Sequence, residues 1–269
     1  MNNLLSATSL YGTNHIIFLC ISLIAITSFY FIMKNKDLTV WLKVMLYLGI
    51  LSELIKVVSY TIMNEGTYNG YLPKTDLPFH LCSIQIIFIL ILNISKNEKL
   101  NRFILSFMLP TCLVGGIMAL LLPTSSSRSV LIISCQYFLY HSMLIAFSIY
   151  LFTSKNIKWE FEDYKNSLKF LLIMAFFAIY INSMCYDVVE YTVEDGKKIV
   201  EYVSRVNFMY IVDPPAENLP ILNKNDGWLA YIIRYALVAV SVITLCYIKP
   251  IIIYIKQILS KQTISNPQD

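Results

Sequence analysis

The chain has 269 residues, of which 57% are hydrophobic and only 14% are charged, and its mean hydropathy is +0.62. Soluble domains carry about a quarter charged residues, so this composition excludes an ordinary soluble protein and indicates a polytopic membrane protein. The net charge of +4 is spread along the chain without a basic stripe. We therefore expect no nucleic-acid partner.

Six cysteines are dispersed along the chain without a Cys-x-x-Cys pair, and only three histidines accompany them. This pattern does not favour a tetrahedral zinc site, so we expect free thiols, no metal and no cofactor. No Lys or Arg precedes Lys34. The first apolar run therefore lacks the positive start of a signal peptide, and we expect it to be a retained anchor.

About twenty apolar residues in a helix cross the hydrocarbon core of a bilayer. By this criterion the chain is all-α, a bundle of seven transmembrane helices in a single integral membrane domain, 1–269. The predicted spans are 14–33, 40–63, 77–94, 102–122, 130–152, 167–186 and 228–248.

The distribution of basic residues predicts the orientation of these spans, because Lys and Arg are enriched on the cytoplasmic side. The first, third and fifth connections with the C-terminal tail carry thirteen basic residues, against six on the other side. We therefore expect a multi-pass protein of the cell membrane, with the N-terminus outside and the C-terminus in the cytoplasm. The long connection 187–227 would also lie outside.

That outer connection contains a hairpin signal. Asp195-Gly196 lies between β-branched and aromatic residues, which is typical of a β-hairpin turn, and a helical extension of the sixth span is the alternative. The prolines Pro214, Pro215 and Pro220 keep the returning segment extended.

Three charged residues lie deeper in the predicted spans than the basic residues at the helix ends. Glu53 and Lys56 lie one helical turn apart and are expected to pair, either as a structural ion pair or as part of a functional site. Arg234 lies about two turns inside the seventh span, so it requires an anion, which would be Glu53 or a ligand phosphate.

The third span opens with several polar side chains. Pro78 is tolerated in a first helical turn, and Thr75 or Asp76 would cap it. On a regular helix His80 and Cys82 are about 200° apart, so they cannot act as a nucleophile–base pair unless the turn is unwound. A base for Cys82 should therefore come from another helix. The alternative is that Cys82 is a small packing residue.

His141 is the only histidine well inside a predicted span. It is expected to act as a general base or to serve a structural role through hydrogen bonds. At 1.5 Å per residue, Cys82, Lys56 and Arg234 lie about 8–10 Å from the outer ends of their helices, Glu53 about 15 Å and His141 about 17 Å. The polar residues are therefore expected to gather in the outer half of the membrane.

The stretch Leu77-Pro78-Phe79-His80-Leu81-Cys82 resembles the Leu-Pro-x-His-Leu-Cys signature of the YwaF-type integral membrane family, bacterial relatives of the eukaryotic transmembrane protein 164. Asn207-Phe208-Met209-Tyr210 and Gly227-Trp228 resemble later segments of that family. This sequence departs from the family pattern in two segments, both expected on the outer side of the membrane. A second Trp-rich element is absent after Trp228, and the segment 187–205 looks like an insertion.

The eukaryotic relative is regarded as a phospholipid acyltransferase that uses the cysteine of this motif and a histidine on a later helix. The resemblance thus implies Cys82 as the nucleophile, His141 as the base and a membrane phospholipid as the partner. We hypothesise acyl transfer or hydrolysis through a Cys82 thioester. Because a thiol buried in lipid stays protonated, it needs a base or a cation.

Other polar residues are assigned supporting roles in this hypothesis. Lys56 or Arg234 would hold a lipid phosphate, and His80 and Asn207 belong to the motifs that carry the resemblance. An oxyanion would be stabilised by Asn182, Gln85 or the N–H groups that open the third helix.

A different class of function is a transporter or small-ligand-binding protein, with Glu53, Lys56 and Arg234 as a polar pocket. No inverted repeat supports alternating access. A retinal Schiff base in the last span is excluded, because no lysine lies between Trp228 and Ile248. The sequence leaves the oligomeric state open.

Overall fold

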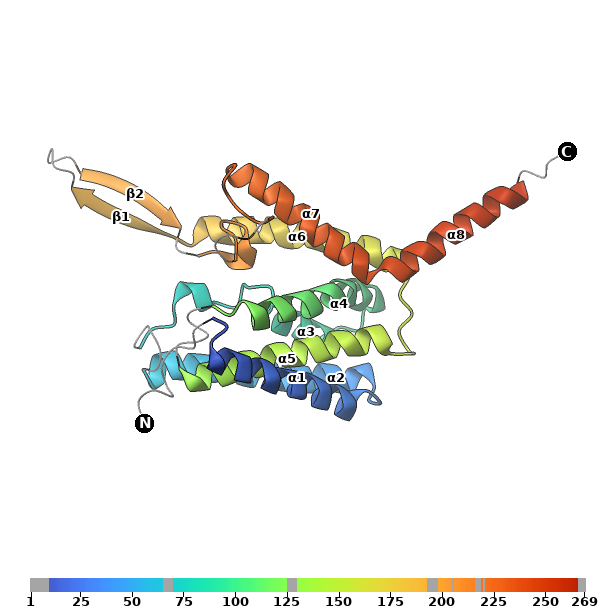
Figure 1. The fold of residues 1–269 in the computed structure, drawn as a ribbon, viewed down its shortest axis with the longest axis horizontal. Coiled ribbons are helices and arrows are strands. Elements are labelled where there is room, and N and C mark those ends of the chain that lie inside the picture. Colours follow the sequence, from blue (N-terminus) through green and yellow to red (C-terminus); the bar gives the residue numbers. More distant parts are fainter. Residues whose placement is uncertain are drawn as a thin grey trace.

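The computed structural model describes residues 10–64, 70–124, 130–192, 198–204, 206–215, 219 and 221–265. The helices are α1 Thr13–Met33, α2 Leu38–Val57, α3 Gln85–Ile94, α4 Glu98–Leu121, α5 Leu131–Thr153, α6 Phe161–Met184, α7 Trp228–Cys246 and α8 Ile248–Ser265 (Figure 1). Strands β1 Tyr186–Thr192 and β2 Lys198–Ser204 form a hairpin, and short helical turns are η1 Val58–Ile62, η2 Lys74–Asp76 and η4 Phe208–Tyr210.

Six of the described helices are long and apolar enough to cross a membrane, and they confirm the multi-pass membrane class. They are α1, α2 with η1, α4, α5, α6 and α7. The predicted third span differs, because α3 has only ten residues and measures about 15 Å, half of a bilayer core. The described residues therefore contain six long apolar helices, where the sequence predicted seven.

The expected helix start at Leu77 is wrong for a local reason. Leu77 is extended, as residues before proline are, and the Phe79 N–H bonds back to the Leu77 carbonyl at 2.7 Å. The chain then passes through turns as far as Ile84, and neither Thr75 nor Asp76 caps α3. We call residues 77–84 the motif turn.

Helices α4 and α5 form the centre of the bundle. They pack against each other, with α1 and α2 against α5, α6 and α7 against α4, and α3 between α2 and α4. In the 18-residue apolar stretches of α4 and α5 more than half of the residues are buried within the protein, against 17% in that of α1 and 11% in that of α7. Apolar side chains left uncovered on outer helices are those expected to face lipid.

Two helices begin earlier than hydropathy predicted. At the start of α4 the Asn97 side chain accepts a hydrogen bond from the Leu100 N–H, and at the start of α6 Glu160 and Asp163 form a capping box. Hydropathy detects only the part of a helix that lies in lipid, so these polar first turns were missed.

The hairpin is confirmed by the antiparallel pairing of β1 and β2, from Tyr186 opposite Ser204 to Thr192 opposite Lys198. Its turn, Asp195-Gly196, lies outside the described residues. Figure 1 shows the hairpin projecting from the end of α6, on the same side of the bundle as the N-terminus. Helix α8 leaves the bundle at the opposite end and contains most of the basic C-terminal tail.

Candidate active site

The motif turn places unpaired backbone donors beside Cys82. Among the described residues, the N–H groups of Leu81, Cys82 and Ser83 have no acceptor in another residue's backbone, because the first bond of the following helix is made by the Ile84 N–H. The N–H groups of Cys82 and Ser83 lie within reach of the Cys82 sulfur. Non-helical backbone at membrane depth is tolerated only where protein covers it or where it lines a cavity.

Lys56 ties the end of α2 to this turn. Its Nζ lies 2.8 Å from Glu53 Oε2 and donates to the Asp76 carbonyl at 2.8 Å, which confirms the predicted Glu53–Lys56 pair. Lys56 is buried, and its α-helix passes directly into η1, a π-helical turn of a kind often found at functional sites. The ion pair therefore positions the segment that leads into Cys82.

Asp76 adds a carboxyl group to this pair. Its Oδ2 is buried without a hydrogen-bond partner among the described residues. Burial raises the pKa of the Asp76 carboxyl, and the nearby ammonium of Lys56 opposes that shift in part. Lys56 and Glu53 are also within electrostatic range of the Cys82 thiol.

Two side chains hold the motif turn from neighbouring helices. The Tyr140 hydroxyl on α5 donates to the Cys82 carbonyl at 2.9 Å. The Gln85 amide donates to the Leu81 carbonyl at 3.0 Å and to Thr111 on α4 at 3.1 Å. The amide donors of Gln85 are thus engaged, while its Oε1 has no partner among the described residues. Gln85 positions the turn.

His141 carries an unpaired base nitrogen but does not touch Cys82. Its Nδ1 lies 2.7 Å from the Tyr137 carbonyl, so Nδ1 carries the proton and Nε2 presents a lone pair. That Nε2 is buried and has no hydrogen-bond partner among the described residues. His141 follows Tyr140 and is rotated by about 100° from it on the helix, which turns the imidazole away from the Cys82 carbonyl.

His80 is fixed on the other side of the motif turn. Its Nε2 lies 3.0 Å from the Thr75 carbonyl and therefore donates to it. The turn is unwound, so the spacing argument against a pair of His80 and Cys82 does not apply. In the described part of the chain, no hydrogen bond joins Cys82 to either histidine.

A segment after the hairpin, residues 207–213, covers the motif turn, and we call it the strap. The ring of Phe208 lies edge-on to His80 at 5.1 Å and to Phe79 at 5.5 Å between ring centroids. Tyr210 lies 6.1 Å from the His80 ring and within electrostatic range of Cys82. The family-like Asn207–Tyr210 stretch and the Cys82 motif are thus neighbours in space.

The strap has a strained backbone that α6 and α7 hold in place. Met209 and Tyr210 have φ angles of 56° and 54°, in the left-handed region that side chains other than glycine rarely adopt. Four successive carbonyls, from Phe208 to Ile211, accept hydrogen bonds from side chains of these helices. The donors, in chain order of the carbonyls, are Asn182, Tyr235, Tyr231 and Trp228.

The two predicted asparagines build this strap. Asn182 donates to the Ala178 and Phe208 carbonyls and accepts from the Phe208 N–H at 2.8 Å, so both amide hydrogens are engaged. Asn207 bonds to the backbone of Val212 and Asp213. Both asparagines therefore have positioning roles in this structure.

Arg234 lies apart from the Glu53–Lys56 pair. It donates to Asp226 at 2.8 Å and to the Asn223 carbonyl at 3.1 Å. The expectation that Glu53 is its anion is thus wrong, because Asp226, two residues before α7, forms the ion pair with the guanidinium. The three-residue polar pocket of the transporter hypothesis is not assembled.

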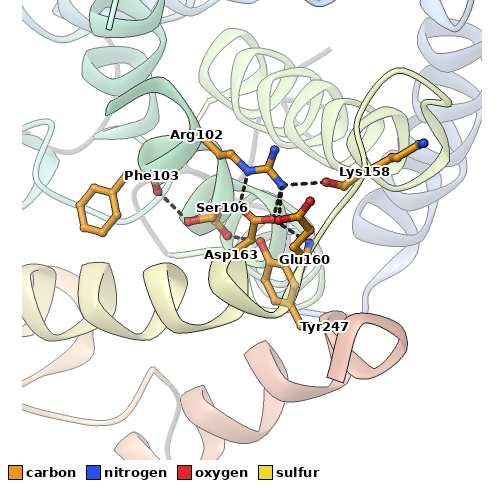
Figure 2. Close-up of polar contacts among 7 residues, drawn as sticks. All are labelled: Arg102, Phe103, Ser106, Lys158, Glu160, Asp163 and Tyr247. Carbon is orange, nitrogen blue, oxygen red and sulfur yellow. Dashed lines mark hydrogen bonds and ion pairs between the residues drawn. The ribbon is translucent and has the colours of Figure 1, made fainter. Parts of the chain in front are cut away.

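A second polar cluster lies near the start of α4, at the other end of the bundle (Figure 2). Arg102 makes two bonds of 2.7 Å to the buried carboxylate of Asp163 and a third, of 2.8 Å, to the Lys158 carbonyl. Beside it the Tyr247 hydroxyl donates to the Ser106 carbonyl at 2.7 Å. These bonds join α4, the α5–α6 connection, α6 and the end of α7.

Sequence reasoning missed Tyr140, Tyr210 and Asp163. The spacing of Glu160 and Asp163 was a usable signal, because acidic residues three apart before an apolar run form capping boxes. Tyr140 and Tyr210 are two of nineteen tyrosines, and nothing local marks them.

Comparison with known proteins adds one finding. A family model described as the TMEM164 family matches residues 10–247. No curated protein and no solved structure matches the chain.

Proposed function

The chain belongs to the TMEM164 family, and from this premise we propose that it is a membrane lipid acyltransferase or lipid hydrolase working through a thioester on Cys82. The observation that carries the proposal is the setting of Cys82. The residue is partly exposed in a non-helical turn between apolar helices, beside N–H groups that, in the described part of the chain, have no acceptor in another residue's backbone. A structural packing cysteine needs none of these features.

The chemistry follows from these groups. The Cys82 sulfur attacks the carbonyl carbon of a lipid ester while its proton passes to a histidine. The N–H groups of Leu81, Cys82 and Ser83 stabilise the oxyanion. The ester C–O bond breaks, the lysolipid oxygen takes the proton, and a thioester remains on Cys82. An acceptor hydroxyl or a water molecule then attacks the thioester and releases the thiol.

We retain His141 as the base. Its Nε2 lone pair is unpaired, and its neighbour Tyr140 already contacts the Cys82 carbonyl. Such a base can bond to its nucleophile in the substrate complex, because catalytic hydrogen bonds often become short and aligned only there. His80 is the second candidate base, because its Nδ1 carries a lone pair two residues from Cys82.

Lys56 is our proposed ligand for the lipid phosphate. An ammonium group has three N–H donors, of which Glu53 and the Asp76 carbonyl take two. The third remains for a phosphate oxygen. Arg234 is less suited, because it contacts Asp226 and Asn223 rather than the segment that leads into Cys82.

We also propose that the motif turn and α3 together complete a seventh crossing, with the N-terminus outside a cell membrane and the C-terminus in the cytoplasm. The excess of basic residues at the end of the bundle that contains Arg102 and α8 supports this orientation. Membership of the YwaF-type bacterial branch rests on the Leu77–Cys82 motif and on the later segments Asn207–Tyr210 and Gly227-Trp228.

The test is mass spectrometry of the protein purified in native lipid. We expect a hydroxylamine-labile fatty acyl group on Cys82, and its rate of formation should fall by about 10² to 10⁴ in His141→Ala. Cys20→Ala removes an exposed thiol on α1 and serves as the control that should change nothing. If the rate of adduct formation falls in His80→Ala and not in His141→Ala, the base is His80.

The proposal fails if no adduct forms on Cys82 and Cys82→Ala leaves the lipid profile of the cell unchanged.

A further inference from the structure

A crevice in the membrane-facing surface lies next to the candidate site. Helices α1 and α2 both pack against α5 and make few contacts with each other. Between them lies a cavity of about 260 Å³ with α5 as its floor. Its apolar walls include Ala25, Phe29, Leu51, Ile55, Leu139 and Met143.

The polar groups in this crevice are occupied by protein partners. Ser52 accepts a hydrogen bond from the Gln136 amide, and the Ser142 hydroxyl donates to the Phe138 carbonyl. The crevice therefore has few free groups that could bind a polar ligand. Its apolar walls suit a hydrocarbon chain, because a chain in the groove gains dispersion contacts that an empty groove lacks.

Tyr140 connects the crevice to Cys82. Its side chain lines the cavity, and its hydroxyl donates to the Cys82 carbonyl at 2.9 Å. On α2 the cavity residue Ser52 precedes Glu53, whose carboxylate pairs with Lys56. An acyl group on the Cys82 sulfur would thus enter the apolar crevice beside Tyr140.

We propose that the crevice between α1, α2 and α5 binds the hydrocarbon chain of the acyl group transferred through Cys82. The proposal rests on the proposed function and adds the place in the fold where the acyl chain of the lipid ester is bound. The crevice then determines which chain lengths are accepted, because each methylene without room in it loses its buried contacts.

The matched variants lie next to each other on α1. Ala25→Phe fills the crevice, whereas the neighbouring Ile24 is exposed away from it, so Ile24→Phe adds apolar volume outside. We expect Ala25→Phe to shift the Cys82 adduct toward shorter chains, with about a fourfold loss for each excluded methylene. Ile24→Phe should leave the chain-length distribution as in the wild type.

A second measurement does not depend on turnover. A phosphatidylcholine with a diazirine at the end of one acyl chain is incorporated into vesicles with the Cys82→Ala protein and photolysed. Crosslinks should map to α1, α2 and α5 residues of the crevice and fall in Ala25→Phe.

The outcomes separate the two proposals. An adduct on Cys82 with an unchanged chain-length distribution in Ala25→Phe, and crosslinks outside the crevice, would overturn the crevice proposal and keep the thioester. Absence of any Cys82 adduct together with crosslinks in the crevice would overturn the thioester and its acyl transfer, and would keep the crevice only as a binding site for a lipid chain.

Discussion

Among single residues, the charged group most closely linked to the motif turn consists of Glu53, Lys56 and Asp76, which interact electrostatically with one another. Lys56 bonds to the carboxylate of Glu53 and to the main chain of Asp76. The Asp76 carboxyl is the third member and has a buried oxygen without a partner among the described residues. A buried acid without a full set of donors favours its protonated form in the folded state.

The first prediction concerns the pH dependence of stability. Because the pKa of Asp76 is raised in the folded protein, its protonated form contributes stability that is present at low pH and lost as pH rises through that pKa. Asp76→Asn keeps a neutral side chain at every pH, so it should unfold at a higher temperature than the wild type at pH 7. The difference should shrink toward pH 4, near the ordinary value of 3.8.

Thermal unfolding in detergent at several pH values checks this prediction. Asp226→Asn is the control for a surface aspartate, and its effect should not follow this pH dependence. An Asp76→Asn variant that is less stable at pH 7 than the wild type would show that the carboxylate is needed.

At the scale of elements, the strap is held by side chains rather than by strand pairing. Asn182 replaces a neighbouring strand by bonding to both the N–H and the carbonyl of Phe208. The left-handed Met209 and Tyr210 cost roughly 1 to 3 kcal/mol each, so the strap persists only while its bonds to α6 and α7 remain. The strap is therefore the element most sensitive to single changes.

The second prediction is that Asn182→Ala releases the strap. Two buried backbone groups of Phe208 lose their partners, so the variant should lose about 2 to 4 kcal/mol of stability. Hydrogen exchange at residues 207–213 should rise, and thermal unfolding reports the stability. Ser183→Ala is the matched control, because its hydroxyl bonds only within α6. Equal exchange in both variants would refute the positioning role.

At the scale of the whole molecule, α4 and α5 carry both polar regions of the bundle. The motif turn packs on the later half of α4, where an added Cβ on Gly115 would meet Leu81 at 3.7 Å. The Arg102–Asp163 cluster lies at its start, and it ties α6 and α7 to the centre (Figure 2). Since α6 and α7 also hold the strap, this cluster supports the candidate site from a distance.

The third prediction is that Asp163→Ala destabilises the bundle far more than a surface pair does. The carboxylate is 1% exposed, and its loss leaves Arg102 without its two-bond partner, so we expect about 2 to 4 kcal/mol. Glu162→Ala, which removes the exposed pair with Lys165, should cost far less, because solvent screens an exposed ion pair. Thermal unfolding of both variants in one detergent compares them, and similar losses would contradict the prediction.

The sequence by itself determined the membrane class, the approximate bounds of the long helices, the hairpin and the Glu53–Lys56 pair. These features depend on hydropathy, helical spacing and turn residues, which act over a few neighbouring positions. Tertiary structure decided the rest. Several hydrogen bonds depend on which segments pack together. They are the bonds of Arg234 to Asp226, of Asn182 to Phe208 and of Tyr140 to Cys82. The motif turn also depends on packing, because Lys56 and Tyr140 bind carbonyls that a regular helix would have used itself.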